Sequence, residues 1–348
     1  MISWRRGTVL SLDREWRGAV ELTVDVGGAP LRALCHPDLV GRPEPGDVAL
    51  LNVTALDLAL GTGGYALVVA FPDRLPADRT GPGHLVKSRY TPLQTVVLGV
   101  DEQDSPAHRL LADEDLLAAP GLPVVVADLH SSLPAVVAGV LADRPEARVA
   151  YVMTDGGALP LWFSRTVAAL SDVLAGTVTV GQAYGGDLEA VTLHSGLLAA
   201  ARVLQADGAV VTQGPGHLGT GTPWGFSGVA AGEAVNAAAA VGGRPVAVLR
   251  MSTADTRPRH RGVSHHSTTA YGRVALAPAD VVVPSSYADL VDRSAFARHR
   301  VVDVDDAGLL EALRSSPAEL STMGRGLDDD PAAFLAAAAA GRYAASLL

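Results

Sequence analysis

From residue 93 onward the chain alternates continuous apolar runs with longer segments of helical periodicity, and this alternation constrains the fold more than any other feature. A strand that is apolar throughout is buried on both faces, as in a parallel sheet covered by helices. The sequence therefore predicts an α/β domain over 93–348 with a mostly parallel, Rossmann-like layered sheet. We expect strands at residues 95–100, 123–128, 148–154, 177–180, 209–212, 245–251, 273–276 and 281–283. We expect helices at residues 132–143, 158–174, 187–206 and 227–241, and a helical end over 306–348.

Residues 1–70 have a different pattern, which predicts a small β-barrel of SH3-like or OB-like type. Five short segments are rich in β-branched residues or alternate apolar with polar ones: 8–12, 19–26, 31–36, 48–54 and 65–70. Gly27-Gly28 separates two of them, as in a hairpin. Residues 71–92 are rich in proline and glycine and are predicted to be a linker.

Charge and composition exclude several classes of protein. The formal net charge is −10, which argues against binding to nucleic acid or to an anionic membrane. The barrel segments lack the basic, aromatic face of a nucleic-acid binder, so we expect them to serve packing or a homo-oligomer. Cys35 is the only cysteine, which excludes a disulfide framework. With neither a signal-peptide pattern nor a long apolar run, the sequence indicates a soluble, cytoplasmic protein.

Polar residues gather directly after the predicted strands of the α/β domain. In open α/β sheets, ligands bind outside the carboxyl ends of the strands. Glycine together with Asp, His, Gln or Ser/Thr follows five consecutive strands, at 128–132, 154–157, 181–187, 213–222 and 252–269. Any one such loop is explained by turn geometry, but five in a row predict a shared polar cleft.

Three candidates for acid–base or metal-assisted chemistry lie in the first two loops: Asp128, His130 and Asp155. Asp128 and His130 point to opposite sides of an extended segment, so they share a ligand only if the chain turns between them. The structural alternative is that Asp128 fixes its loop and that Asp155, before Gly156-Gly157, is a turn residue.

Gly214, Gly216 and Gly219 match the spacing of a dinucleotide-binding loop after a strand. The residues that follow postpone the helix to about Ser227, so NAD(P) is unlikely. The loop, with Thr220, is better suited to present backbone N–H groups to a phosphate or carboxylate. His217 within the loop is a candidate acid or base.

Cationic residues cluster in segment 255–267 of this otherwise acidic chain, which predicts an anion site next to a helix start. The candidate residues are Arg257, Arg259, His260, Arg261 and Ser264. The alternative is that the arginines pair with carboxylates of the surface or of a partner subunit. His265 is a further candidate catalytic residue, and we expect at most one of His265 and His266 to face a shared ligand.

Five stretches carry a family resemblance along the chain, at 83–92, 128–131, 153–160, 214–222 and 259–267. In these stretches the chain resembles the bacterial domain-of-unknown-function family number 3866. The resemblance implies membership of that family and brings no established activity or catalytic residue.

These features lead to one preferred function and two alternatives. We expect an enzyme that binds a small anionic metabolite and carries out hydrolysis or group transfer. A divalent metal is compatible with the His and carboxylate residues, but no ligand spacing is diagnostic, so the cofactor stays unknown. The alternatives are a non-catalytic regulatory protein that binds a nucleotide or an anion, and a structural oligomer.

Overall fold

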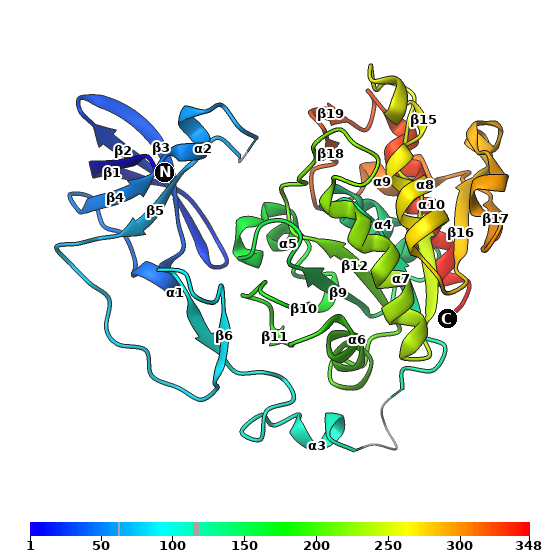
Figure 1. The fold of residues 1–348 in the computed structure, drawn as a ribbon, viewed down its shortest axis with the longest axis horizontal. Helices are drawn as coiled ribbons and strands as arrows, with labels where there is room; N and C mark the ends of the chain where they lie inside the picture. Colours follow the sequence, from blue (N-terminus) through cyan, green and yellow to red (C-terminus); the bar gives the residue numbers. More distant parts are fainter. Residues whose placement is uncertain (62, 114–117) are drawn as a thin grey trace. The chain divides into compact units, whose positions relative to one another are not determined.

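The computed structural model describes residues 1–61, 63–113 and 118–348, which form two compact units (Figure 1). The first unit comprises Met1–Pro82, Val86–Val96 and Trp162–Ala168. The second comprises Gly83–Leu85, Val97–Leu161 and Ala169–Leu348. Across the described residues, no helix combines the length and the apolar character needed to cross a bilayer.

The first unit contains a closed barrel of five strands, in the order β1-β2-β3-β5-β4, which confirms the predicted barrel. The strands are β1 (Trp4–Trp16), β2 (Ala19–Val26), β3 (Ala29–Cys35), β4 (Val48–Asn52) and β5 (Ala66–Ala70). The alternation expected of a strand is clear in β2, where Val20, Leu22 and Val24 are all buried in the barrel core. Cys35 is also buried there, and burial raises the pKa of its thiol to about 12. The thiol is therefore an unreactive core group.

The second unit is built on an eight-stranded sheet in the order β11-β10-β9-β12-β8-β13-β16-β17, and every neighbouring pair is parallel. This confirms the predicted parallel sheet. Its strands are β8 (Pro123–Val126), β9 (Val149–Thr154), β10 (Leu174–Thr179), β11 (Leu188–Glu189), β12 (Gly208–Gln213), β13 (Arg244–Val248), β16 (Asp280–Pro284) and β17 (Arg300–Val304).

Helices form two groups around this sheet. In one group α4 (Leu133–Asp143) packs on α9 (Leu309–Arg314) and α10 (Pro331–Ala345). In the other, α6 (Leu193–Arg202) packs on α7 (Ala230–Ala240). The α4–α10 contact depends on glycine, because a side chain at Gly139 would collide with the Ala338 carbonyl and one at Gly341 with the Val136 carbonyl.

The structure corrects five details of the predicted elements. The helical end expected over 306–348 is interrupted between α9 and α10 by the paired strands β18 (Ser321–Thr322) and β19 (Arg325–Gly326). Residues 95–100 join the large sheet only through a parallel bridge between Gly99 and Glu189 of β11, because β7 (Thr95–Val97) pairs with β6 (Leu85–Lys87). The expected strand 273–276 is wrong, since Ala270–Val274 is a π-helical turn that continues α8 (His265–Thr269). The helix expected over 187–206 begins only at Leu193, because Thr192 caps it. The helix expected over 158–174 shortens to Leu161–Phe163 and α5 (Arg165–Ala169).

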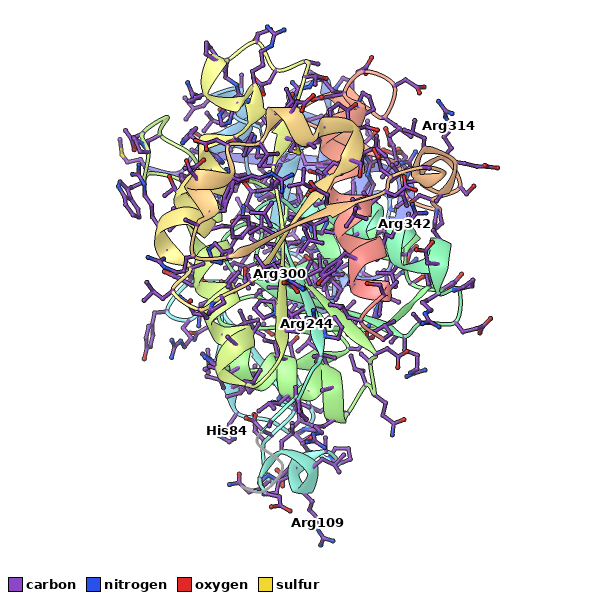
Figure 2. All side chains as sticks on the ribbon, turned by 90° about the vertical axis from the view of Figure 1, so that its right-hand side faces the viewer. His84, Arg109, Arg244, Arg300, Arg314 and Arg342 are labelled. Atoms are coloured by element: carbon purple, nitrogen blue, oxygen red, sulfur yellow. The ribbon has the colours of Figure 1, made fainter. Side chains whose placement is uncertain are left out.

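The amino ends of three neighbouring strands, β13, β16 and β17, carry charged residues that pair with one another. Asp280, the first residue of β16, accepts hydrogen bonds from Arg300 at 2.6 Å, Tyr343 at 2.9 Å and Arg244 at 3.2 Å. Arg244 and Arg300 are the first residues of β13 and β17, which flank β16 (Figure 2). The charged groups at this end of the sheet are therefore paired with one another. The unpartnered polar groups described below lie at the other end.

Candidate functional site

The carboxyl ends of β8 and β12 form a switch point of the sheet. The two strands are neighbours, but the chain leaves β8 through α4 toward β9 and leaves β12 through α7 toward β13, in the opposite direction. Because such crossovers are right-handed, the two helices lie on opposite faces of the sheet. Open α/β sheets bind ligands at this kind of position.

Asp128, which follows β8, lies at the centre of a group of polar side chains. Its Oδ2 atom is 3.5 Å from Arg250 Nη1, 3.5 Å from His266 Nδ1 and 4.0 Å from His217 Nε2. Arg250 Nη1 is also 2.9 Å from His266 Nδ1. Burial alone would raise the pKa of Asp128, but the His266 contact and the Arg250 charge hold it below its usual value. Asp128 is therefore a buried carboxylate at neutral pH.

Two further imidazoles extend this group, and we name Asp128, His217, His260, His265 and His266 together the Asp–His cluster. The His265 and His266 rings meet edge to face with centroids 4.5 Å apart, and His260 is 4.9 Å from His266. The Phe226 ring stacks on His266 at 3.7 Å. The rings therefore pack against one another.

Three histidines of the cluster, His217, His260 and His265, have lowered pKa values that favour the neutral ring at pH 7. Burial lowers the pKa of His217 to about 4. Burial, together with the charges of Arg250 and Arg257, lowers the pKa of His260 to about 3, and burial also lowers that of His265. A neutral imidazole keeps one nitrogen lone pair, which can accept a proton or bind a metal.

Two overlapping groups within the cluster offer metal-ligating atoms. Among the described residues, Asp128, His217 and His266 form one group, and His260, His265 and His266 form the other. In each group, one ligand atom per residue lies within 4.8 Å of the others. His265 and His266 both belong to the second group, at the start of the short helix α8, whereas the sequence led us to expect that at most one of them would face a shared ligand.

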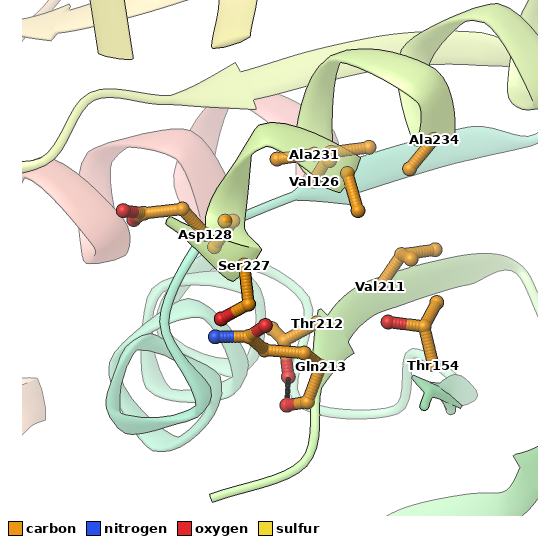
Figure 3. Close-up of a pocket in the computed structure, with 12 residues that line it drawn as sticks. Val126, Asp128, Thr154, Val211, Thr212, Gln213, Ser227, Ala231 and Ala234 are labelled. Carbon is orange, nitrogen blue, oxygen red and sulfur yellow. Dashed lines mark hydrogen bonds between the residues drawn. The ribbon is translucent and has the colours of Figure 1, made fainter. Parts of the chain in front are cut away.

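A small cavity lies beside the cluster, between the ends of β8 and β12 (Figure 3). Its volume is about 10 Å³, which is close to the space that one water molecule needs. Gln213 lines it and is only 5% exposed, yet neither its Oε1 nor its Nε2 has a hydrogen-bond partner. The Nε2 atoms of His217 and His265 are likewise buried without a partner. Such groups are rare in folded proteins and indicate a bound water or ligand.

The arginines predicted to bind an anion have different environments. Arg257 is held by Asp255, with Nη2 2.7 Å from Oδ2. Arg259 is exposed, and its charge contributes to the lowered pKa of His265. Arg261 is exposed as well, and the structure shows no ion pair for either residue within the described parts of the chain. Only Arg259 therefore combines a free guanidinium with a position next to the cluster.

The glycine-rich loop contributes His217 and little else to the cluster. Two of its backbone N–H groups bond within the protein: Gly214 donates to Thr154 O at 3.2 Å, and Thr220 donates to Gly225 O at 2.7 Å. Gly216 and Gly219 lie in the same loop, which folds back as a hairpin onto Phe226. The first helical turn after the loop begins at Ser227, as expected from the sequence.

His130 and Asp155 lie outside the Asp–His cluster. His130 Nδ1 is 3.0 Å from the Tyr151 hydroxyl, which is 2.9 Å from Thr212 Oγ1. Asp155 is exposed, and its Oδ2 accepts the Gln182 N–H at 2.8 Å. Ser264 serves the cluster indirectly, because its Oγ contacts His260 Nδ1 at 2.8 Å and accepts the N–H of His266.

Arg250 and Phe226 were not predicted to belong to the site, whereas Gln213 and His266 lie in loops that were predicted to line the cleft. Arg250 carried a usable signal, because it comes two residues after the end of β13 and so lies at a strand end like Asp128. Gln213 ends β12 in the same way. Phe226 gave none, since an isolated aromatic residue in a loop does not indicate which ring it stacks on.

Fold and site together define an α/β protein with a buried carboxylate–imidazole cluster at the switch point of a parallel sheet. The chain belongs to the family described as "Protein of unknown function (DUF3866)", whose family model matches residues 32–341 of the 348. This confirms the resemblance. No curated protein is similar enough to the chain to count as a match.

Proposed function

We propose that the chain is an enzyme that hydrolyses a small anionic metabolite, or transfers a group from it, at the Asp–His cluster. One observation carries the proposal: Asp128, His217 and His266 come from three separate segments and converge around Arg250 at the strand ends. Buried titratable groups with shifted pKa values, next to unpartnered polar atoms, are typical of functional sites.

His217 has the features of a general base in this proposal. Its Nε2 atom has no partner and lies 4.0 Å from the Asp128 carboxylate. The lowered pKa, about 4, keeps the ring neutral and able to accept a proton from an attacking water or hydroxyl group. The nearby carboxylate stabilises the imidazolium that forms, as an orienting aspartate does in other catalytic arrangements.

Arg259 is the proposed contact for the anionic part of the substrate. Arg250 and Arg257 are already engaged, with Asp128 and His266 in one case and with Asp255 in the other. Arg259 is the remaining cation next to His265, and it is exposed to solvent. Guanidinium groups bind phosphate and carboxylate with two parallel hydrogen bonds.

Turnover assays with phosphatase, esterase and transferase substrates test the proposal. The variant His217→Ala is expected to lower kcat/KM for any substrate that is turned over by about 100-fold or more, because it removes the base. His194→Ala is the matched control, since His194 is an exposed histidine of α6. Unchanged turnover in His217→Ala would refute the proposal, and a ligand that stabilises the protein without being consumed would favour the regulatory alternative.

Several sequence-based expectations stay predictions alongside this function. They are the Rossmann-like and SH3-like or OB-like identities of the two folds, the domain boundaries at 70 and 93, a homo-oligomer, a cytoplasmic location and the absence of nucleic-acid binding. The acid–base roles expected of His130 and Asp155 also stay predictions, with the same assays as their test.

A further inference from the structure

We propose that His260, His265 and His266 form a binding site for a divalent transition-metal ion of the zinc type. The three residues each offer a ring nitrogen within 4.8 Å of the others, and His260 and His266 are buried. The role of this metal site rests on the proposed function, because the metal would act beside His217.

One serine contacts two of the three histidines. Ser264 Oγ is 2.8 Å from His260 Nδ1, and it also accepts the backbone N–H of His266 as the N-cap of α8. When the imidazole donates from Nδ1 to the serine, its Nε2 keeps the lone pair that a metal needs. Metal-ligating histidines commonly have such a partner behind the ring, because it sets the tautomer and the orientation.

His265 provides the independent sign of a ligand. Its Nε2 atom is buried and has no hydrogen-bond partner in the described structure. A buried nitrogen without a hydrogen-bond partner destabilises the fold. Coordination of a metal by the lone pair satisfies the atom without protonating it.

The group that contains Asp128 and His217 is the weaker place for the ion. Arg250 Nη1 lies 3.5 Å from Asp128 Oδ2 and 2.9 Å from His266 Nδ1, so a fixed positive charge already faces both ligand atoms. Asp128 instead lies behind His266, 3.5 Å from Nδ1.

The donor set indicates the kind of ion. Three imidazole nitrogens suit zinc and its neighbours, whereas magnesium and calcium prefer oxygen ligands. Three histidines with an open fourth position are also an arrangement in which zinc holds a reactive water. The only thiol of the chain, Cys35, is buried in the barrel core and belongs to the first unit.

Metal titration of the full chain tests the site directly. The protein is stripped with a chelator, and binding of Zn²⁺ is then measured by equilibrium dialysis with elemental analysis, and that of Co²⁺ by visible absorbance. The wild-type chain is expected to bind one ion. His260→Ala and His265→Ala are each expected to weaken binding by at least about 100-fold, more than the loss of an outer contact does. His194→Ala, on the surface of α6, is expected to bind normally.

The outcomes separate the metal site from the proposed catalysis. Far-UV circular dichroism checks that each variant folds, and His265→Gln is a milder replacement if His265→Ala does not. Absence of binding by the wild-type chain overturns the inference, as does binding that survives in folded His260 and His265 variants. Loss of binding in His217→Ala alone places the ion in the other group and also overturns it. Turnover that persists in chelator but needs His217 overturns the metal site and leaves the proposed function intact. If the chain binds one ion but turns over no substrate, the metal site stands and the proposed function is refuted.

Discussion

Arg250 and Asp128 face each other inside the second unit, with Nη1 3.5 Å from Oδ2 and with side chains only 11% and 5% exposed. The arginine is the one full positive charge in contact with a carboxylate that burial would otherwise push toward the neutral form. This relationship makes the site sensitive to the loss of either partner.

Replacement of the arginine tests how strongly the two charges depend on each other. Arg250→Met leaves Asp128 buried without its cation, and we expect the free energy of unfolding to fall by about 3–5 kcal/mol. Urea denaturation measures the loss. Arg293→Met is the control, because its pair with Asp303 is about half exposed and is worth about 1 kcal/mol or less. Equal losses in the two variants would show that the Arg250 charge is not needed inside the fold.

His130 predicts a loss of stability in mild acid. Burial lowers the pKa of His130 to about 4, below the value near 6.5 of an unfolded chain. The unfolded state therefore binds the proton more readily, and the contribution of the neutral ring is complete above pH 6.5 and is lost as the pH falls from 6.5 to 4. The loss amounts to at most about 3 kcal/mol. Unfolding curves of the wild-type chain and of His130→Gln, measured between pH 7 and 4, should converge if this assignment is correct.

Replacement of Gln213 is expected to change stability and activity in opposite directions. Because neither polar atom of its buried side chain has a partner, Gln213→Met is expected to raise the free energy of unfolding by roughly 1–3 kcal/mol. The same change should lower turnover, since the amide faces the cavity beside Asp128 (Figure 3). Gln103→Met, at an exposed position, should alter neither quantity. A destabilised Gln213→Met variant would show that the amide serves the fold instead.

Arg259 predicts the anion dependence of the site. Arg259→Ala is expected to raise the Kd for inorganic phosphate by about 10-fold or more, the usual effect of losing a charge-assisted hydrogen bond. Thermal shift over a series of phosphate concentrations measures the constant. Arg261→Ala removes an equally exposed arginine two residues away and should leave the Kd unchanged. Similar Kd values in both variants would refute the contact.

Gly228 leaves no room for a side chain beside His217, the proposed base. A β-carbon at this position would lie 2.9 Å from His217 Nε2 and 2.9 Å from the Asp128 β-carbon. Gly228→Ala should therefore displace His217 and lower kcat by about 100-fold, without removing any polar group. Gly208→Ala is the control, because its nearest contact would be at 3.4 Å. Full activity in Gly228→Ala would show that His217 has no fixed position in the reaction.

The local pattern of the sequence was sufficient to predict most strands of both folds. Alternation in segments such as 19–26 predicts the barrel strands, and apolar runs such as 149–154 predict the parallel sheet. Strand β17 escaped prediction, because it lies at the sheet edge and Arg300 and Asp303 interrupt its apolar pattern. Position relative to strand ends was also enough to single out Asp128 and His217.

Only the tertiary structure decided which of these loops share a site. The order of strands in the sheet places β12 between β9 and β8, with Val211 next to Val126, so that the loop with His217 reaches Asp128. Strand order depends on the packing of distant helices and strands, and no local period of the sequence encodes it. For the same reason the sequence determined that segment 255–267 is cationic, while tertiary contacts decided that Arg257 pairs with Asp255, that Arg259 stays free, and that His260, His265 and His266 come together.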